Sequence, residues 1–66
     1  MTVTVLIRRN EYTDWLEAFV EQGGQRSVNL LGARKCSSIS EAKQRVRAEL
    51  TRAIAAGVEI VWDIKD

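Results

Sequence analysis

Few side chains in this chain have the chemistry that catalysis requires. The sequence has no histidine, so it lacks an imidazole that could act as a general base, a proton shuttle or a metal ligand. Its single cysteine, Cys36, follows Lys35, and a neighbouring cation favours the reactive thiolate. Without a histidine partner, however, Cys36 is expected to be an inert residue at the end of a strand. The sequence therefore argues against an enzyme.

Carboxylates are the other candidates for chemistry. Residues 10–25 contain four acids and no base: Glu11, Asp14, Glu17 and Glu21. Calcium loops place oxygen ligands at short alternating spacing around a sharp glycine turn, and this run lacks that spacing. The Gly23-Gly24 pair is not followed by the Lys-Ser or Lys-Thr of a phosphate-binding loop, so it is interpreted as a turn. We expect no metal and no cofactor.

Three segments have patterns that predict regular structure. Residues 2–8 and 58–64 alternate apolar and polar side chains and are rich in β-branched residues, which is typical of strands. Between them, Ser38 and Glu41 have the spacing of a helix capping box, and Gly57 stands where a left-handed helix cap is expected. The predicted helix has one apolar stripe, formed by Ile39, Ala42, Val46, Leu50, Ala53 and Ile54.

Residues 12–22 allow two interpretations. Their apolar side chains fall at helical spacing, and Gly23 could end such a helix. As a strand, the segment would instead form a hairpin with residues 28–32 through a three-residue turn at Gly23-Gly24-Gln25. That turn pairs Val20 with Val28 and Ala18 with Leu30, so both apolar sets lie on one face of the hairpin. We favour the hairpin and keep the helix as the alternative.

Length and pattern together predict one small α+β domain over residues 1–66. The favoured order is strand, strand, strand, helix, strand: a single antiparallel or mixed sheet of about four strands, with one long helix on one face. The alternative order is strand, helix, strand, helix, strand. The lone cysteine favours a reducing compartment, and no segment has the pattern of a signal peptide or a membrane span. We therefore expect a cytoplasmic protein without a membrane partner.

One candidate surface is apolar. In the hairpin interpretation three large side chains point away from the helix, on a sheet face that should be polar: Trp15, Phe19 and Leu31. Exposed apolar patches of this kind mark association, so these residues, with Arg34 and Lys35 at the rim, form the predicted protein-binding surface. A homo-oligomer is compatible with the same surface. The competing interpretation is that Trp15 and Phe19 enlarge the small core.

A second candidate surface is basic. It consists of Arg34, Lys35, Arg45, Arg47 and Arg52, which could meet the phosphates of a nucleic acid. The net charge of +1 gives no strong attraction to nucleic acid, and the segment lacks the aromatic residues that stack on bases. We therefore expect a solvated helix face and keep nucleic-acid binding as the alternative function.

In size and layout the chain resembles the compact proteins of phages and mobile elements, including some anti-CRISPR inhibitors. Those proteins are also very short, often α+β, and without catalytic residues. The resemblance rests on architecture and not on matched residues, so no site is carried over from it. It implies an activity by occlusion, in which the protein binds a complex and blocks a surface or a conformational step. The sequence thus predicts a small non-enzymatic protein-binding module.

Overall fold

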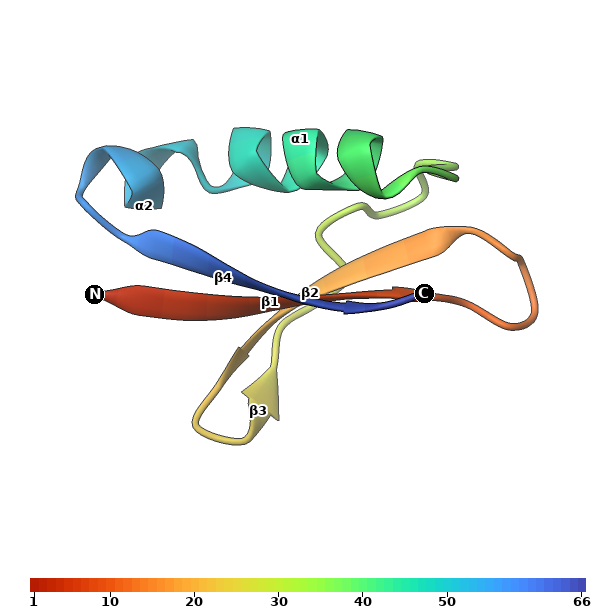
Figure 1. Cartoon of the computed structure of the whole chain (residues 1–66), viewed down its shortest axis with the longest axis horizontal. Helices are drawn as coiled ribbons and strands as arrows, with labels where there is room; N and C mark the ends of the chain where they lie inside the picture. Colours follow the sequence, from red (N-terminus) through yellow and green to blue (C-terminus); the bar gives the residue numbers. More distant parts are fainter.

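Four strands form one mixed sheet, and two consecutive helices lie along one of its faces (Figure 1). The computed structural model describes all residues from Met1 to Asp66. The strands are β1 (Thr2–Arg9), β2 (Leu16–Gln22), β3 (Gln25–Arg26) and β4 (Glu59–Lys65), and the helices are α1 (Ile39–Glu49) and α2 (Thr51–Ala55). The spatial order is β3-β2-β1-β4, with β1 antiparallel to β2 and parallel to β4. The predicted α+β class and the favoured element order are confirmed, and the order with two separate helices between strands is wrong.

The core lies between the sheet and α1. Side chains alternate along a strand, so every second residue of β1 and β2 faces the helices. The fully buried cluster consists of Val5, Ile7, Leu16, Ala18, Leu31, Cys36, Ala42 and Val46. Only nine of the 66 residues are buried, so each of these side chains contributes a large share of the apolar packing.

The helical segment begins and ends where its sequence predicts. The Ser38 hydroxyl oxygen accepts a hydrogen bond from the Glu41 backbone N–H at 3.2 Å, which satisfies one free donor of the first turn. At the other end Gly57 has φ of 95°, and Val58 N–H donates to Ala53 C=O, which is the bond pattern of a Schellman cap.

One long helix was expected, and this expectation is wrong. The segment is interrupted at Leu50, whose φ of −101° and ψ of 20° separate α1 from the short α2. The Thr51 hydroxyl donates to the backbone oxygens of Arg47 and Ala48, at 3.2 and 2.8 Å. A threonine that bonds back to the preceding turn bends a helix, which gives a physical reason for the break.

The hairpin between β2 and β3 exists, so the strand interpretation of residues 12–22 is confirmed for 16–22, whereas residues 12–15 belong to the loop before β2. The predicted register of the hairpin is wrong. The turn has two residues, because Gln22 pairs with Gln25 and Glu21 with Arg26. Gly23 and Gly24 have φ of 58° and 79°, so both take the positive φ that a two-residue type I′ turn requires. This register places Ser27 beside Val20, and Val28 is 81% exposed instead of lying in the apolar face.

Side chains continue the β2 edge where β3 stops. The Val20 N–H donates to the Ser27 hydroxyl oxygen at 2.9 Å, and the Ala18 N–H donates to the Asn29 side-chain oxygen at 3.0 Å. The same Asn29 oxygen accepts from the Leu31 N–H at 3.1 Å. These bonds hold residues 27–31 against β2 without a regular strand. They also turn Leu31 into the core, where it is fully buried. The expectation that Leu31 faces outward is therefore wrong.

Replacing Asn29 by alanine is expected to lower the free energy of unfolding by about 1–3 kcal/mol, because the amides of Ala18 and Leu31 would lose their shared acceptor. Urea denaturation followed by circular dichroism measures this change. Asn29→Asp keeps an oxygen acceptor and should lose much less. An Asn29→Ala protein that unfolds at the wild-type urea concentration would show that the two bonds do not support the fold.

Candidate protein-binding surface

The loop between β1 and β2 has a fixed shape that projects two aromatic side chains. The Asn10 side-chain oxygen accepts from the N–H groups of Tyr12 and Thr13, at 2.8 and 3.1 Å, which forms an Asx turn. Asp14 takes a positive φ of 65°, and the Asn10 N–H then donates to the Trp15 C=O at 2.9 Å, where β2 begins. Tyr12 is 90% exposed and Trp15 is 37% exposed.

Phe19 lies on the face of the sheet opposite the helices. It is the β2 partner of Leu6, which is only 3% exposed, and its own side chain is half-buried. The guanidinium carbons of Arg8 and Arg26 lie 5.4 and 5.2 Å from the centre of its ring, within the range of cation–π attraction. The same arginines form ion pairs with neighbouring acids of β2, at 3.4 Å to Glu17 and 3.8 Å to Glu21. The Phe19 ring is therefore flanked by two arginines, each of which is paired with an acid of β2.

Trp15, Arg34 and Lys35 line one open hollow of about 320 Å³. Trp15 immediately precedes β2, and the two basic residues come from the loop that joins β3 to α1. Arg34 forms an exposed ion pair with Glu49 at 3.3 Å, whereas Lys35 has no carboxylate within ion-pair distance. Three of the five side chains predicted from the sequence are thus brought together, while Phe19 lies farther along the outer face and Leu31 lies in the core.

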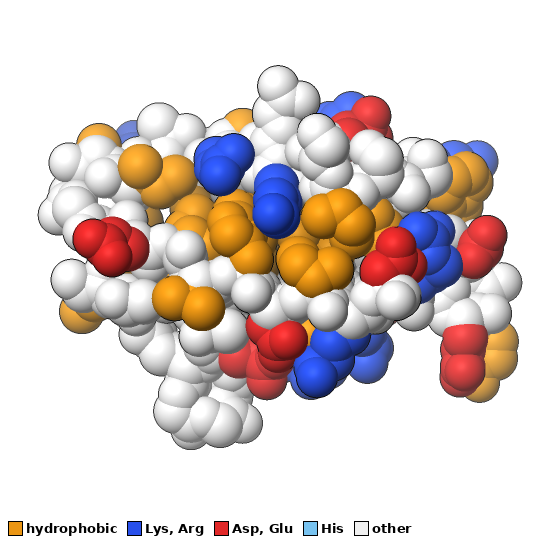
Figure 2. Space-filling view, in the orientation of Figure 1, with side chains coloured by type: hydrophobic (Ala, Val, Ile, Leu, Met, Phe, Trp, Pro, Cys, Tyr) orange, Lys and Arg blue, Asp and Glu red, His pale blue; other side chains and the backbone are white.

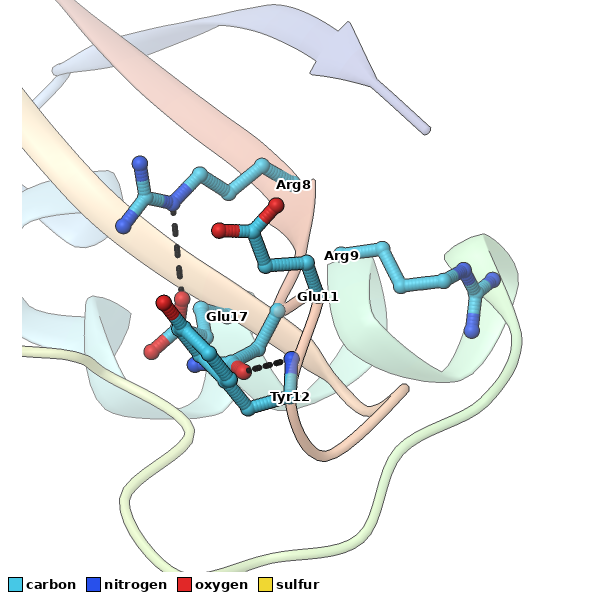
Figure 3. A pocket seen from close by; sticks show the side chains of 6 residues that line it. Arg8, Arg9, Glu11, Tyr12 and Glu17 are labelled. Atoms are coloured by element: carbon cyan, nitrogen blue, oxygen red, sulfur yellow. Dashed lines mark hydrogen bonds and ion pairs between the residues drawn. The ribbon is translucent and has the colours of Figure 1, made fainter.

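A second hollow, of about 280 Å³, lies on the other side of the β1–β2 loop. Figure 3 shows Arg8, Tyr12 and Glu17 converging on it, while the Arg9 side chain points away. Glu17 lines both hollows, so the two adjoin on the outer side of the sheet. Tyr12, Trp15 and Phe19 are three of the four aromatic residues of the chain, and we refer to them together as the aromatic surface.

Tyr12 and Arg8 were missed as candidate site residues. Tyr12 was considered only as a member of an apolar helical stripe, yet it occupies a turn and is almost fully exposed. Asn10, two residues earlier, is the signal that could have identified this turn, since asparagine side chains cap turns in this way. Arg8 could have been placed on the outer face from the alternation of β1.

The basic residues predicted to contact nucleic acid do not all lie together. Arg34 and Lys35 line the hollow beside Trp15, whereas the other three belong to the helices: Arg45, Arg47 and Arg52. Arg45 pairs with Glu41 at 3.8 Å, and Arg47 lies 5.5 Å from the centre of the Trp62 ring. Much of this positive charge therefore already has a partner within the protein.

Cys36 is fully buried in the core, and its backbone C=O accepts from the Leu16 N–H at 2.9 Å. Burial raises the pKa of the Cys36 thiol, and the nearby Glu41 raises it further. The thiol is therefore held in its protonated, weakly nucleophilic form. Glu11, Asp14, Glu17 and Glu21 were considered as cation ligands. They are not part of any group of three or more His, Cys, Asp or Glu side chains that could hold a metal ion. Neither helix is long and apolar enough to cross a membrane.

Native Cys36 is expected to resist alkylation by iodoacetamide, because the thiol is buried and its raised pKa keeps it protonated. Adding urea should expose it and make labelling fast. Mass spectrometry of the labelled fraction against time measures both rates. Equal rates with and without urea would contradict the buried position.

Comparison of the chain with known protein families, with curated proteins and with solved structures finds no match. Its fold and surface define a small α+β domain whose mixed sheet is covered by helices on one face only.

Proposed function

We propose that this chain is a small non-enzymatic protein-binding module that acts by occluding a surface of its partner. The observation that supports this proposal most is the shared hollow of Trp15, Arg34 and Lys35, with Tyr12 at the adjoining hollow and Phe19 farther along the same face. Protein interfaces concentrate their energy in a few aromatic and arginine side chains, surrounded by a polar rim. The aromatic surface and its flanking charges have this composition.

The charges suggest what the partner presents. Lys35 has no acidic partner within the chain, and the pair between Arg34 and Glu49 is half-exposed, so it contributes little and exchanges readily. A carboxylate of the partner can bind these two cations while an apolar neighbour packs against Trp15. The proposed partner segment therefore combines an acidic and an apolar side chain.

The mode of action follows from the resemblance to compact proteins of phages and mobile elements. An inhibitor of that kind, including the anti-CRISPR type, needs only a docking surface and no catalytic group. A lone cysteine favours a reducing, cytoplasmic compartment for such a protein. Binding at the aromatic surface would block whichever partner surface it covers.

Affinity capture from a lysate of the native host tests the class of partner. The immobilised full chain is expected to retain a protein that survives nuclease treatment. Retention that disappears with nuclease would point to the alternative, a nucleic-acid-binding accessory protein. In that case affinity for duplex DNA should fall with salt, with a log–log slope of about −0.9 per phosphate neutralised.

A further inference from the structure

The two edges of the sheet differ in how their backbone groups are satisfied. The β3 edge is only two residues long, and Ser27 and Asn29 side chains continue it. At the other edge β4 has seven residues and only β1 as a neighbour. A long edge strand without proline, bulge or cover is a template for pairing with another strand.

The backbone geometry shows which β4 groups are free. The Glu59 N–H donates to the Met1 C=O at 2.8 Å, so the peptide groups of residue 59 point toward the start of β1. Successive residues of a strand direct these groups to alternate sides, so the N–H and C=O of Ile60, Trp62 and Ile64 point to the open edge. No hydrogen bond outside the regular ladders uses them.

The same three residues carry apolar side chains that the helices only partly cover. They pair with the inward-facing residues of β1, so they lie on the helix side of the sheet, and Ile64 is 38% exposed. Helix α1 packs closest to β2. Trp62 is half-buried against the edge of the core, and the cationic ends of Lys43 and Arg47 lie over its ring, at 5.4 and 5.5 Å from the centre. Figure 2 shows hydrophobic side chains gathered in a band between the helical layer and the sheet.

We propose that β4 pairs with β4 of a second copy of this chain, antiparallel, about a twofold axis through Trp62. In this register Trp62 faces Trp62 of the second copy, and Ile60 faces Ile64. The backbone N–H and C=O groups of Ile60, Trp62 and Ile64 then form two hydrogen bonds with the opposite residue of the second copy. Their apolar side chains meet on the helix side, which closes the partly exposed band from both copies.

Charge selects this register among those that keep the apolar residues on one face. At the ends of the strands Glu59 faces Lys65, so the dimer gains two pairs of opposite charge. Moving the axis to Val61 places Glu59 opposite Asp63, and moving it to Asp63 places two Asp63 side chains opposite each other. Like charges directly opposite each other are destabilising. In both shifted registers one of the three residues Ile60, Trp62 and Ile64 in each copy also has no strand partner for its backbone groups at the open edge. This pairing uses a different surface from the proposed function and does not depend on it.

Sedimentation equilibrium of the full chain over a range of concentrations tests the proposal. We expect a reversible change from the 7.4 kDa monomer to a species of twice that mass. Glu59→Lys and Lys65→Glu should each weaken the dimer by about tenfold, because each replaces two attractive pairs with two repulsive ones. The double variant Glu59→Lys with Lys65→Glu restores the opposite charges and should restore the dimer.

A second variant tests the edge itself. Ile64→Lys places a charge on the helix side of the strand and should give a monomer with an unchanged circular-dichroism spectrum. A chain that stays monomeric up to millimolar concentration contradicts the proposal and leaves the edge to a strand of another protein. A dimer that is insensitive to Ile64→Lys and to both charge reversals also contradicts it, because such a dimer must form through another surface.

Discussion

Replacing Leu31 by alanine is expected to lower the free energy of unfolding by about 2–5 kcal/mol, which is the usual cost of truncating a buried leucine. Leu31 is fully buried in a core of only eight residues. Its truncation would leave a cavity, and so small a core has no further layer of side chains that could move in to fill it. The total stability of a small domain is only a few times larger than this loss. We therefore expect much of the variant to be unfolded at physiological temperature.

Urea denaturation of Leu31→Ala, with Val28→Ala as its matched control, measures this effect. Val28 lies three residues earlier in the same segment and is 81% exposed, so its truncation should leave stability almost unchanged. If Leu31→Ala kept wild-type stability and lost partner binding, Leu31 would be a surface residue and the register of residues 27–31 would be wrong.

Replacing Trp15 and Phe19 together by alanine is expected to weaken binding of the captured partner by about a thousandfold, since an aromatic hot-spot residue of an interface costs about 2 kcal/mol or more when it is truncated. Trp15 is 37% exposed, and Phe19 lies on the uncovered face between two arginines. Isothermal titration calorimetry with the partner gives the change in Kd, and the circular-dichroism melting curve shows whether the fold persists.

Phe19 is half-buried and is the register partner of the buried Leu6, so its truncation can cost stability as well as binding. Tyr12→Ala separates the two effects, because this ring is 90% exposed and contributes nothing to the core. Tyr12→Ala should weaken binding at unchanged stability. Arg52→Ala on the helix side is the matched control and should leave binding unaffected. A partner that is lost with Arg52→Ala and retained with Tyr12→Ala would place the interface on the helices.

The elements that the sequence predicted well are those specified by neighbouring residues. Alternation defined β1 and β4, and Ser38 and Gly57 marked the two ends of the helical segment because their effects act within one turn. The break at Leu50 was missed because the apolar stripe continues through it, while the back-bonding of Thr51 leaves no trace in hydrophobic periodicity.

The errors arose where side chains replace backbone pairing. Matching apolar residues favoured a three-residue turn, but Ser27 and Asn29 supply oxygens that satisfy β2 in a different register. A one-residue shift reverses the direction of each side chain, which moved Leu31 from the outer face to the core. The meeting of Trp15 with Lys35, and the parallel pairing of β1 with β4, depend on contacts between distant segments that no local pattern encodes.

Site-specific photo-crosslinking tests the central claim most directly, that the aromatic surface contacts a protein partner. A photoreactive phenylalanine analogue is placed at Tyr12 in one variant and at Arg52 in another, both of which are exposed positions. We predict a covalent adduct with the captured protein from position 12 and none from position 52. An adduct from position 52 alone would contradict the account.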